Sequence, residues 1–354
     1  MQKIDRIEFA YPVTEMFQAD AEFLYGREPT PRRMPDGSIV SLIYTGGTKE
    51  PHPDNIAAFI RSDDDGATWS RPELLWKHPQ RCTWGTEIFT EGERPFAIFQ
   101  TFCYETNYAE LRAFMTYTDD SGRSWAPPVS VPGLPANFSV RQGKVLSDGS
   151  WLFPVYWVEN RDEWTNCRDP FVCGVIRSTD GGKTFSLHGN VPTPGHAWEP
   201  EVVELEPGHL RMWIRYEHDA AVLWESDSFD YGLTWSAARP GDIPNPGTKF
   251  VCYKIRDRYV MINNVCAPDR RERDVLEIWV SSDFCKSWSK KLPLARLYKE
   301  DPGTWNGFWE HCGPLPQVAY PHGFADDKEE KLYLAIDAVR KFYFLKVPYA
   351  DLLD

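Results

Sequence analysis

The chain has 354 residues, a formal net charge of −13 and an aromatic content of 14%, with 15 tryptophans and 29 prolines. An acidic chain lacks the basic surface that phosphate binding requires, so the charge argues against nucleic acid as a partner. The aromatic and proline content favours short strands joined by many turns, and it argues against both a helical protein and a disordered chain.

The first nine residues contain no continuous apolar core, and no run of 18 apolar residues occurs in the sequence. We therefore expect a soluble protein with no membrane partner, cytoplasmic as given, or secreted or periplasmic if a signal peptide was removed. Eight cysteines, at positions 82, 103, 167, 173, 252, 266, 285 and 312, show no Cys-x-x-Cys pair and no histidine spacing suited to zinc. Buried free thiols are the expected state of these side chains.

Strand-like runs follow one another along the chain, beginning with residues 3–10. Six later runs are interpreted as the innermost strands of six repeated units: residues 38–44, 95–102, 151–156, 209–215, 258–263 and 331–336. Residues 341–347 supply one more strand, but the chain ends before a complete fourth strand. We therefore expect residues 3–10 to pair beside residues 341–347 and complete the last unit, because this pairing removes an exposed sheet edge.

An eight-residue pattern, Ser/Thr-x-Asp-x-Gly-x-Ser/Thr-aromatic, recurs through the chain. Intact copies occupy residues 62–69, 118–125, 178–185 and 228–235, and a degenerate copy at residues 281–288 has Cys285 in place of the glycine. The aspartate can bond backbone amides of its own tight turn, and the glycine supplies a positive φ. We expect the Cys285 turn to follow a different backbone path, because cysteine adopts a positive φ only at a cost.

The copies start 50 to 60 residues apart, and an apolar strand-like run precedes each one. Repeats of about this length that each build a small antiparallel sheet are typical of propeller blades. The sequence therefore predicts an all-β fold, a six-bladed β-propeller of four-stranded antiparallel blades, with residues 1–354 forming a single domain.

The repeat resembles the Asp-box, or BNR repeat, of the sialidase (neuraminidase) superfamily, and the resemblance extends from about residue 27 to residue 347. It implies the propeller fold. Asp-boxes also occur in proteins that cleave nothing, so function depends on a separate site, which the resemblance places at the centre of the ring.

A second resemblance concerns a glutamate and an arginine. Residues 198–215 are similar to the sialidase stretch Asn-Glu-x-Gln-Val-Val-Glu-Leu-x-x-Gly-x-Leu-x-Met-x-x-Arg. In that family the first glutamate activates the nucleophile and the arginine binds the substrate carboxylate, which implies these roles for Glu199 and Arg215. Glu201 is the competing assignment, since alternate residues share a face of a regular strand.

The resemblance also implies a first arginine, in a Phe/Tyr-Arg-Ile-Pro segment nine residues before an Asp-Gly turn. Arg27 has this spacing, although Gly26 and Glu28 replace the aromatic residue and the isoleucine. Arg32 and Arg33 are close enough to be alternatives.

The family's third arginine precedes a strand that leads into a late Asp-box, and Arg273 fits this spacing better than Arg270 or Arg271. Tyr320 resembles the family's tyrosine nucleophile, which replaces the carboxylate nucleophile of most glycosidases. A substrate carboxylate would repel an Asp or Glu but not a tyrosine. We expect the three arginines to converge beside Tyr320, and the polar atoms of Tyr320 and Glu199 to approach hydrogen-bond distance.

The general acid of the family is an aspartate in the loop after the first strand run, which implies Asp54, with Glu50 and His52 as alternatives in the same loop. Other polar residues at the starts of blades are expected to line the pocket as substrate contacts: Glu87, Arg141, Gln142 and Lys249.

These residues imply a sialidase-like retaining exo-glycosidase, a hydrolase that releases a terminal carboxylate-bearing sugar from a glycan or oligosaccharide. No cofactor and no metal are expected, and the sequence leaves the oligomeric state open. Two alternatives remain. One is a lyase acting on a terminal uronic acid with His52, His196 or His322 as the base, and the other is a glycan-binding propeller without chemistry.

Overall fold

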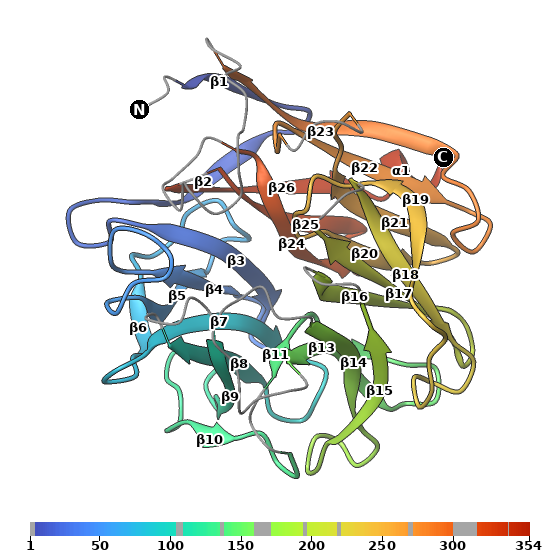
Figure 1. Cartoon of the computed structure of the whole chain (residues 1–354). Helices are drawn as coiled ribbons and strands as arrows, with labels where there is room; N and C mark the ends of the chain where they lie inside the picture. Colours follow the sequence, from blue (N-terminus) through green and yellow to red (C-terminus); the bar gives the residue numbers. More distant parts are fainter. Residues whose placement is uncertain are drawn as a thin grey trace.

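The computed structural model describes residues 4–103, 109–134, 138–158, 171–193, 197–217, 221–267, 272–299, 317–338 and 340–354. In these ranges the chain forms six antiparallel sheets, arranged as blades around a common centre, and one short helix, α1 (Ala350–Leu353) (Figure 1). This confirms the predicted all-β, six-bladed propeller. None of the helices in the described ranges is long and apolar enough to cross a membrane.

The first three blades follow the chain from the centre outward. The first consists of β3 (Gly26–Arg33), β4 (Ile39–Thr45), β5 (Ile56–Ser62) and β6 (Glu73–Trp76). The second consists of β7 (Cys82–Phe89), β8 (Phe96–Cys103), β9 (Ala109–Tyr117) and β10 (Val129–Ser130). In the third, two short strands, β11 (Ser139–Val140) and β12 (Lys144–Val145), share the innermost place beside β13 (Trp151–Val158), β14 (Phe171–Ser178) and β15 (Ser186–Pro192).

The other three blades close the ring. The fourth consists of β16 (Ala197–Glu206), β17 (His209–Tyr216), β18 (Val222–Ser228) and β19 (Arg239–Pro244). The fifth consists of β20 (Val251–Ile255), β21 (Arg258–Asn264), β22 (Val275–Ser281) and β23 (Lys290–Lys299), with β1 (Ile4–Phe9) as a fifth strand. The sixth consists of β24 (Ala319–Asp326), β25 (Lys331–Asp337), β26 (Lys341–Pro348) and β2 (Val13–Gln18).

The six runs predicted as innermost strands are the second strands of their blades, from β4 to β25. These second strands contain long apolar runs, as expected of strands whose two faces both pack inside the protein. The true innermost strands, such as β3, β16 and β24, carry charged residues and prolines that interrupt any apolar pattern. The strongest strand signal in the sequence therefore lies one strand away from the centre.

The N-terminal pairing was predicted wrongly. Residues of β1 pair with β23 in the fifth blade, and it is β2 that pairs with β26 and completes the sixth blade. Burial explains the choice, because Phe17 of β2 is 5% exposed and its ring stacks on Phe342 at a centroid distance of 4.8 Å. The mixed polar sequence of β2 hides this anchor from a search for apolar runs.

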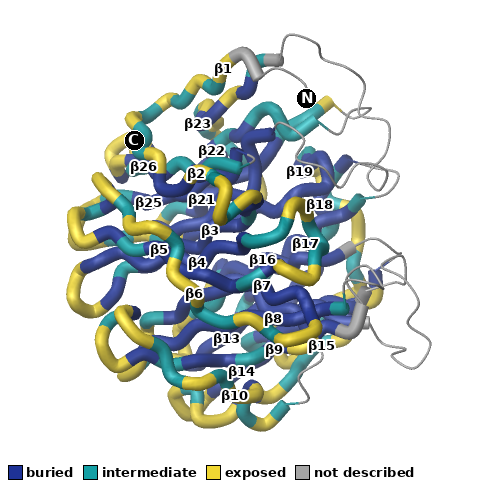
Figure 2. Tube along the Cα trace, turned by 90° about the vertical axis from the view of Figure 1, so that its left-hand side faces the viewer, coloured by how far each residue is buried: buried dark blue, intermediate teal, exposed yellow. Residues whose placement is uncertain are grey.

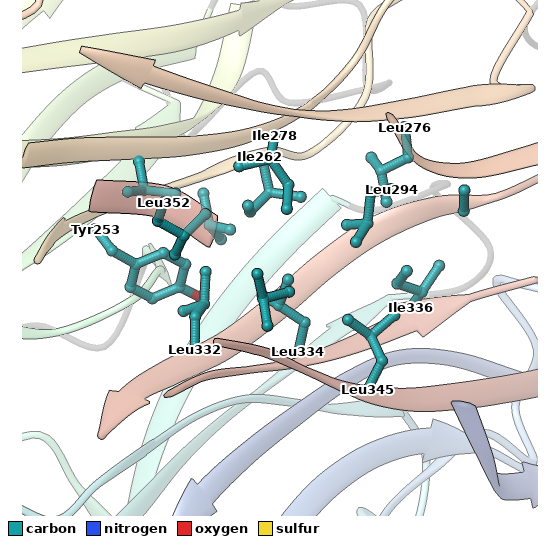
Figure 3. Close-up of a cluster of buried hydrophobic side chains, with 14 of the residues drawn as sticks. Tyr253, Ile262, Leu276, Ile278, Leu294, Leu332, Leu334, Ile336, Leu345 and Leu352 are labelled. Carbon is teal, nitrogen blue, oxygen red and sulfur yellow. The ribbon is translucent and has the colours of Figure 1, made fainter. Parts of the chain in front are cut away.

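The hydrophobic core lies between neighbouring blades. Between the fifth and sixth blades, Ile278 and Leu294 face Leu334 and Leu345, and Leu352 of α1 closes the cluster (Figure 3). Each side chain of this size contributes about 1.5–3 kcal/mol when fully buried. The turns at the rim are exposed while the central strands are buried (Figure 2).

The Asp-box turns join the third and fourth strands of the first five blades, at the outer rim of the ring. In all five, the aspartate accepts bonds from the Ser or Thr four residues on, at 2.8–2.9 Å from the amide and 2.6 Å from the hydroxyl. The predicted departure at Cys285 is wrong, since this turn makes the same bonds. Cys285 adopts φ +59°, and packing in the apolar cluster with Cys252 and Trp279 offsets the strain.

Candidate functional site

Three innermost strands, β3, β16 and β24, are interrupted by a bulge near their first residues. Each bulge holds a buried non-glycine residue with φ between +49° and +51°, and each of these residues precedes a proline: Glu28, Glu199 and Tyr320. Proline removes a ladder donor, and a bulge re-aims the side chain beside it. Left-handed backbone at a non-glycine residue costs roughly 1–3 kcal/mol, and such strain concentrates at functional sites.

Tyr320 is surrounded by the three predicted arginines. The guanidinium carbons of Arg27, Arg273 and Arg215 lie 4.3, 5.4 and 5.9 Å from the centroid of its ring. Arg273 Nη1 also lies 3.1 Å from Tyr320 Oη. Four residues that the sequence spreads over nearly 300 positions therefore meet at one point of the ring.

Acidic groups and one backbone carbonyl fix the arginines. Arg27 Nε lies 2.6 Å from Asp337 Oδ2, and Arg215 pairs with Glu217. Arg215 Nε and Arg273 Nη2 both donate to the carbonyl of Gly247, at 2.9 and 2.7 Å. Burial, together with the neighbouring guanidiniums, lowers the pKa of Arg273. Three guanidiniums that converge in a buried space are suited to hydrogen-bond an anionic ligand.

Two residues of this support, Asp337 and Glu217, were missed by sequence reasoning. Asp337 ends β25, and Glu217 follows two residues after Arg215. An acidic residue near an arginine is common on any surface, so only the ring geometry shows which pairs are buried.

Glu199 is buried and pairs with Arg215, and its other oxygen lies 3.5 Å from Arg141 Nη1. Burial alone would raise the pKa of Glu199, but these guanidiniums outweigh burial and lower it to about 2. Glu201 does not share this site, because the bulge after Trp198 breaks the strand alternation, and its carboxylate lies 2.5 Å from Lys144 Nζ.

The expected direct bond between Tyr320 and Glu199 is not present among the described residues. Tyr320 Oη contacts Arg273, while Glu199 is held by Arg215 and Arg141. The reason is electrostatic, because an ionised glutamate inside an arginine cluster binds the nearest guanidinium before it binds a neutral phenol.

The other predicted contact residues form a charged layer beside this cluster. Arg141 Nη2 and Lys249 Nζ lie 3.3 and 3.5 Å from Glu28 Oε2. Burial, followed by the charge of Arg141, lowers the pKa of Lys249 to about 8. Gln142 Nε2 donates to the carbonyl of Gly323 at 3.3 Å.

Glu87 belongs to a separate buried group with Arg32 and His322. Its carboxylate lies 2.7 Å from Arg32 Nη2 and 3.6 Å from His322 Nε2. Burial raises the pKa of Glu87 to about 7, and burial together with nearby cations, Lys249 first, lowers the pKa of His322 well below its ordinary value. Arg32 is therefore occupied, and Arg33 pairs with acidic residues elsewhere, which leaves Arg27 as the first arginine of the site.

Asp54 does not join the cluster. Its side chain is 65% exposed and pairs with Lys77 at 3.3 Å, and its amide donates to His52 Nδ1. Glu50, in the same loop, accepts a bond from Tyr25 Oη at 3.2 Å, and its charge is one of those that raise the pKa of Arg27, after that of Asp337. Arg270, Arg271 and His196 lie outside the described residues. Within those residues no group of His, Cys, Asp and Glu is arranged to hold a metal ion.

A six-bladed ring with Asp-box turns and an arginine cluster at its centre defines a sialidase-like BNR-repeat propeller. The chain belongs to the family described as BNR repeat-like domain, whose model matches residues 38–329. No curated protein sequence matches the chain significantly.

Solved structures share the fold at low identity. A Hadza microbial sialidase, Hz136, has a TM-score of 0.73 and 15% identity, over 96% of this chain and 69% of that one. The Trypanosoma rangeli sialidase in complex with sialic acid has a TM-score of 0.65 and 17% identity, over 98% of this chain and 60% of that one. A protein of unknown function from Dyadobacter fermentans has a TM-score of 0.68 and 14% identity, over 97% of this chain and all of that one.

Proposed function

We propose that the protein is a sialidase-like retaining exo-glycosidase that releases a terminal sugar acid from a glycan. The observation that carries the proposal is the convergence of Arg27, Arg215 and Arg273 on Tyr320. Guanidiniums from three blades offer charge-assisted bonds to a carboxylate. The sialic acid complex of the Trypanosoma rangeli sialidase, which shares this fold, supports sialic acid or a related sugar as the ligand class.

In this mechanism Tyr320 Oη attacks the anomeric carbon, and the glycosidic oxygen leaves with a proton from a general acid. The phenol proton passes to Glu199, and Arg273 Nη1, which lies 3.1 Å from Tyr320 Oη, stabilises the developing negative charge on the phenolic oxygen. Water then attacks the glycosyl-tyrosine, so the anomeric configuration is retained.

Substrate binding supplies the basicity that Glu199 lacks at rest. Arg215 holds Glu199 ionised, and the same guanidinium is one of the three that would receive the substrate carboxylate. A second carboxylate on Arg215 weakens its hold on Glu199, which raises the pKa of Glu199 and allows it to accept the tyrosine proton. The base is therefore activated only when a sugar acid is bound.

The general acid of this proposal is Glu50, in place of the Asp54 expected from the sequence. Glu50 contacts Tyr25, and its charge acts on Arg27 of the site, whereas the contacts of Asp54 lie with Lys77 and His52. A general acid must come within hydrogen-bond reach of the leaving oxygen, and proximity to Arg27 favours Glu50.

The test is a panel of terminal sialosides and uronosides, with release of free sugar acid as the readout. Tyr320→Phe removes the attacking oxygen and keeps the ring, so kcat/KM should fall by roughly 10³-fold or more while the fold survives. The matched control is Tyr333→Phe, a buried tyrosine of the same blade whose ring lies 4.9 Å from Arg33 and outside the site. Undiminished release of sugar acid by Tyr320→Phe would end the tyrosine mechanism.

The same panel separates the two alternatives. A lyase would give an unsaturated product that absorbs in the ultraviolet and would depend on a histidine, yet the pKa of His322 is held well below its ordinary value, which makes it a weak base. Binding of sugar acids without turnover of any substrate would instead favour a glycan-binding propeller.

A further inference from the structure

Glu28 shares the backbone geometry of the proposed base and nucleophile, yet the mechanism above gives it no role. It precedes a proline, lies in the bulge of β3 and has φ +49°, against +51° for Glu199 and Tyr320. The ring therefore carries the same strained arrangement in three blades, each with an ionisable side chain. Strain of roughly 1–3 kcal/mol persists where the surrounding structure enforces it, and this points to a function for the third copy.

The contacts of Glu28 are one-sided. Both of its cationic partners, Arg141 and Lys249, lie against Oε2, at 3.3 and 3.5 Å. Oε1 accepts no hydrogen bond from a described residue, although the side chain is only 5% exposed. Oε1 is not one of the fully buried side-chain atoms that lack a partner in the described part of the chain, so it is open to a ligand, and a ligand that donates to it would form a hydrogen bond to a carboxylate.

Glu28 belongs to the same site as the proposed catalytic groups. It follows Arg27, whose guanidinium lies over the ring of Tyr320, and it shares Arg141 with Glu199. Arg141 thus holds one carboxylate through each of its terminal nitrogens. A sugar acid bound by the three arginines would have the open oxygen of Glu28 beside it.

The surrounding charges define what Oε1 can accept. A cationic group would meet Arg141 and Lys249, an anionic group would be repelled by Glu28 itself, and an apolar group would leave the oxygen unbonded. A neutral hydrogen-bond donor satisfies all three conditions. Sugar acids carry two kinds of neutral donor, hydroxyl groups and amide N–H groups.

We propose that Glu28 is a specificity-determining residue whose Oε1 accepts a hydrogen bond from a neutral donor of the bound sugar acid, a hydroxyl or an amide N–H. This inference rests on the proposed function, because it takes the sugar acid held by Arg27, Arg215 and Arg273 as the ligand. The competing role is structural, with Glu28 serving only to neutralise Arg141 and Lys249.

Glu28→Gln separates the two roles because it is isosteric. Arg141 and Lys249 would bind the amide oxygen, so the amide nitrogen would take the place of Oε1. It would face an amide N–H donor to donor, and it could bond a hydroxyl only as a donor, without the charge that strengthens a bond to a carboxylate. The assay measures kcat/KM for a parent sugar acid glycoside and for analogues in which one hydroxyl at a time is replaced by hydrogen, or the acylamino group by hydrogen. For the wild type, kcat/KM should be roughly 10- to 100-fold lower for one analogue than for the parent glycoside. For Glu28→Gln, kcat/KM for that same analogue should be less than about 3-fold below the value for the parent.

The position of the sensitive analogue identifies the donor as hydroxyl or amide. Glu201→Gln makes the same chemical change at a buried carboxylate of β16 that pairs with Lys144, and it should retain the wild-type discrimination. An unchanged discrimination in Glu28→Gln, with a lowered unfolding temperature and equal losses on every substrate, would show the structural role and overturn the proposal.

Binding of the free sugar acid and its analogues to Tyr320→Phe protein, measured by calorimetry, keeps this inference separable from the proposed reaction. Discrimination in binding that Glu28→Gln abolishes, without turnover by the wild type, would support the Glu28 role and refute the hydrolase. Turnover by the wild type, with a discrimination between analogues that Glu28→Gln leaves unchanged, would support the hydrolase and refute the Glu28 role. Failure of every sugar acid to bind or to react would refute both.

Discussion

Glu199→Gln tests whether the arginine cluster holds this glutamate ionised. The substitution keeps the size of the side chain and removes its charge, while Arg215 and Arg141 remain in place. In the folded protein these guanidiniums lower the pKa of Glu199 from 4.5 to about 2, against the opposing effect of burial. A shift of this size corresponds to about 3 kcal/mol of stability.

The direction of the pH dependence follows from the lowered pKa. A carboxyl whose folded pKa lies below its unfolded value stabilises the protein fully above the unfolded pKa, and that contribution is lost as the pH falls towards the folded pKa. For Glu199 the window runs from pH 4.5 down to about 2. The free energy of unfolding of the wild type should exceed that of Glu199→Gln by about 3 kcal/mol at pH 7, and by about 2 kcal/mol at pH 3.5.

Urea unfolding at pH 7, 5 and 3.5 measures the difference. Glu206→Gln is the control, because it makes the same change at an exposed position of β16 and should stay within about 0.5 kcal/mol of wild type throughout. A Glu199→Gln protein as stable as wild type at pH 7, or a difference that does not shrink at pH 3.5, would refute the proposed electrostatics.

Arg273→Lys should raise KM for a sugar acid roughly 10- to 100-fold, because one ammonium cannot bond Gly247, Tyr320 and a substrate carboxylate as a guanidinium does. Steady-state kinetics measures this, with Arg33→Lys as the control outside the site, and an unchanged KM would remove Arg273 from the carboxylate site. Deletion of residues 1–10 removes only the extra strand β1 and should lower the thermal unfolding temperature by a few degrees, since the partly buried Ile7 and Phe9 are lost while the four other strands of the fifth blade remain. Deletion of residues 1–18 also removes β2 and should leave the protein largely insoluble, and equal solubility and melting of the two deletions would contradict the assignment of β2 as the closing strand.

The repeated turn made the fold predictable from the sequence. Each Asp-box bonds mainly within its own eight residues, so its signal is local and survives in one sequence. The Cys285 turn shows the limit of local reasoning. A positive φ costs cysteine conformational energy, but the burial of its side chain in the apolar cluster contributes enough free energy to offset that cost. The predicted pairing of residues 3–10 with residues 341–347 failed for the same reason, since the choice of the strand that completes the sixth blade depends on burial that a local pattern does not encode.

The candidate site divides in a similar way. Arg27, Arg215, Arg273, Glu199 and Tyr320 were found because a family resemblance supplied their spacing, and the structure brings the three arginines around the tyrosine. The acid assignment to Asp54 rested on residue type and loop position, and neither can tell which way a loop turns its side chains. The pairings of Asp337 and Glu217 join distant strands or depend on burial, so no pattern in the sequence reveals them.

The pairing of β2 with β26 has a consequence for how the protein is made. Apart from β1, β2 is synthesised before every other strand of the ring, whereas β26 is the last strand of the ring to be synthesised. Until then the sixth blade lacks its outer edge, and the β2 segment carries unpaired backbone groups and the apolar side chains of Met16 and Phe17. Where several chains are synthesised close together, that segment can pair with the β26 of another nascent chain. A dimer in which two rings exchange their β2 strands is therefore the expected misassembled product at high expression.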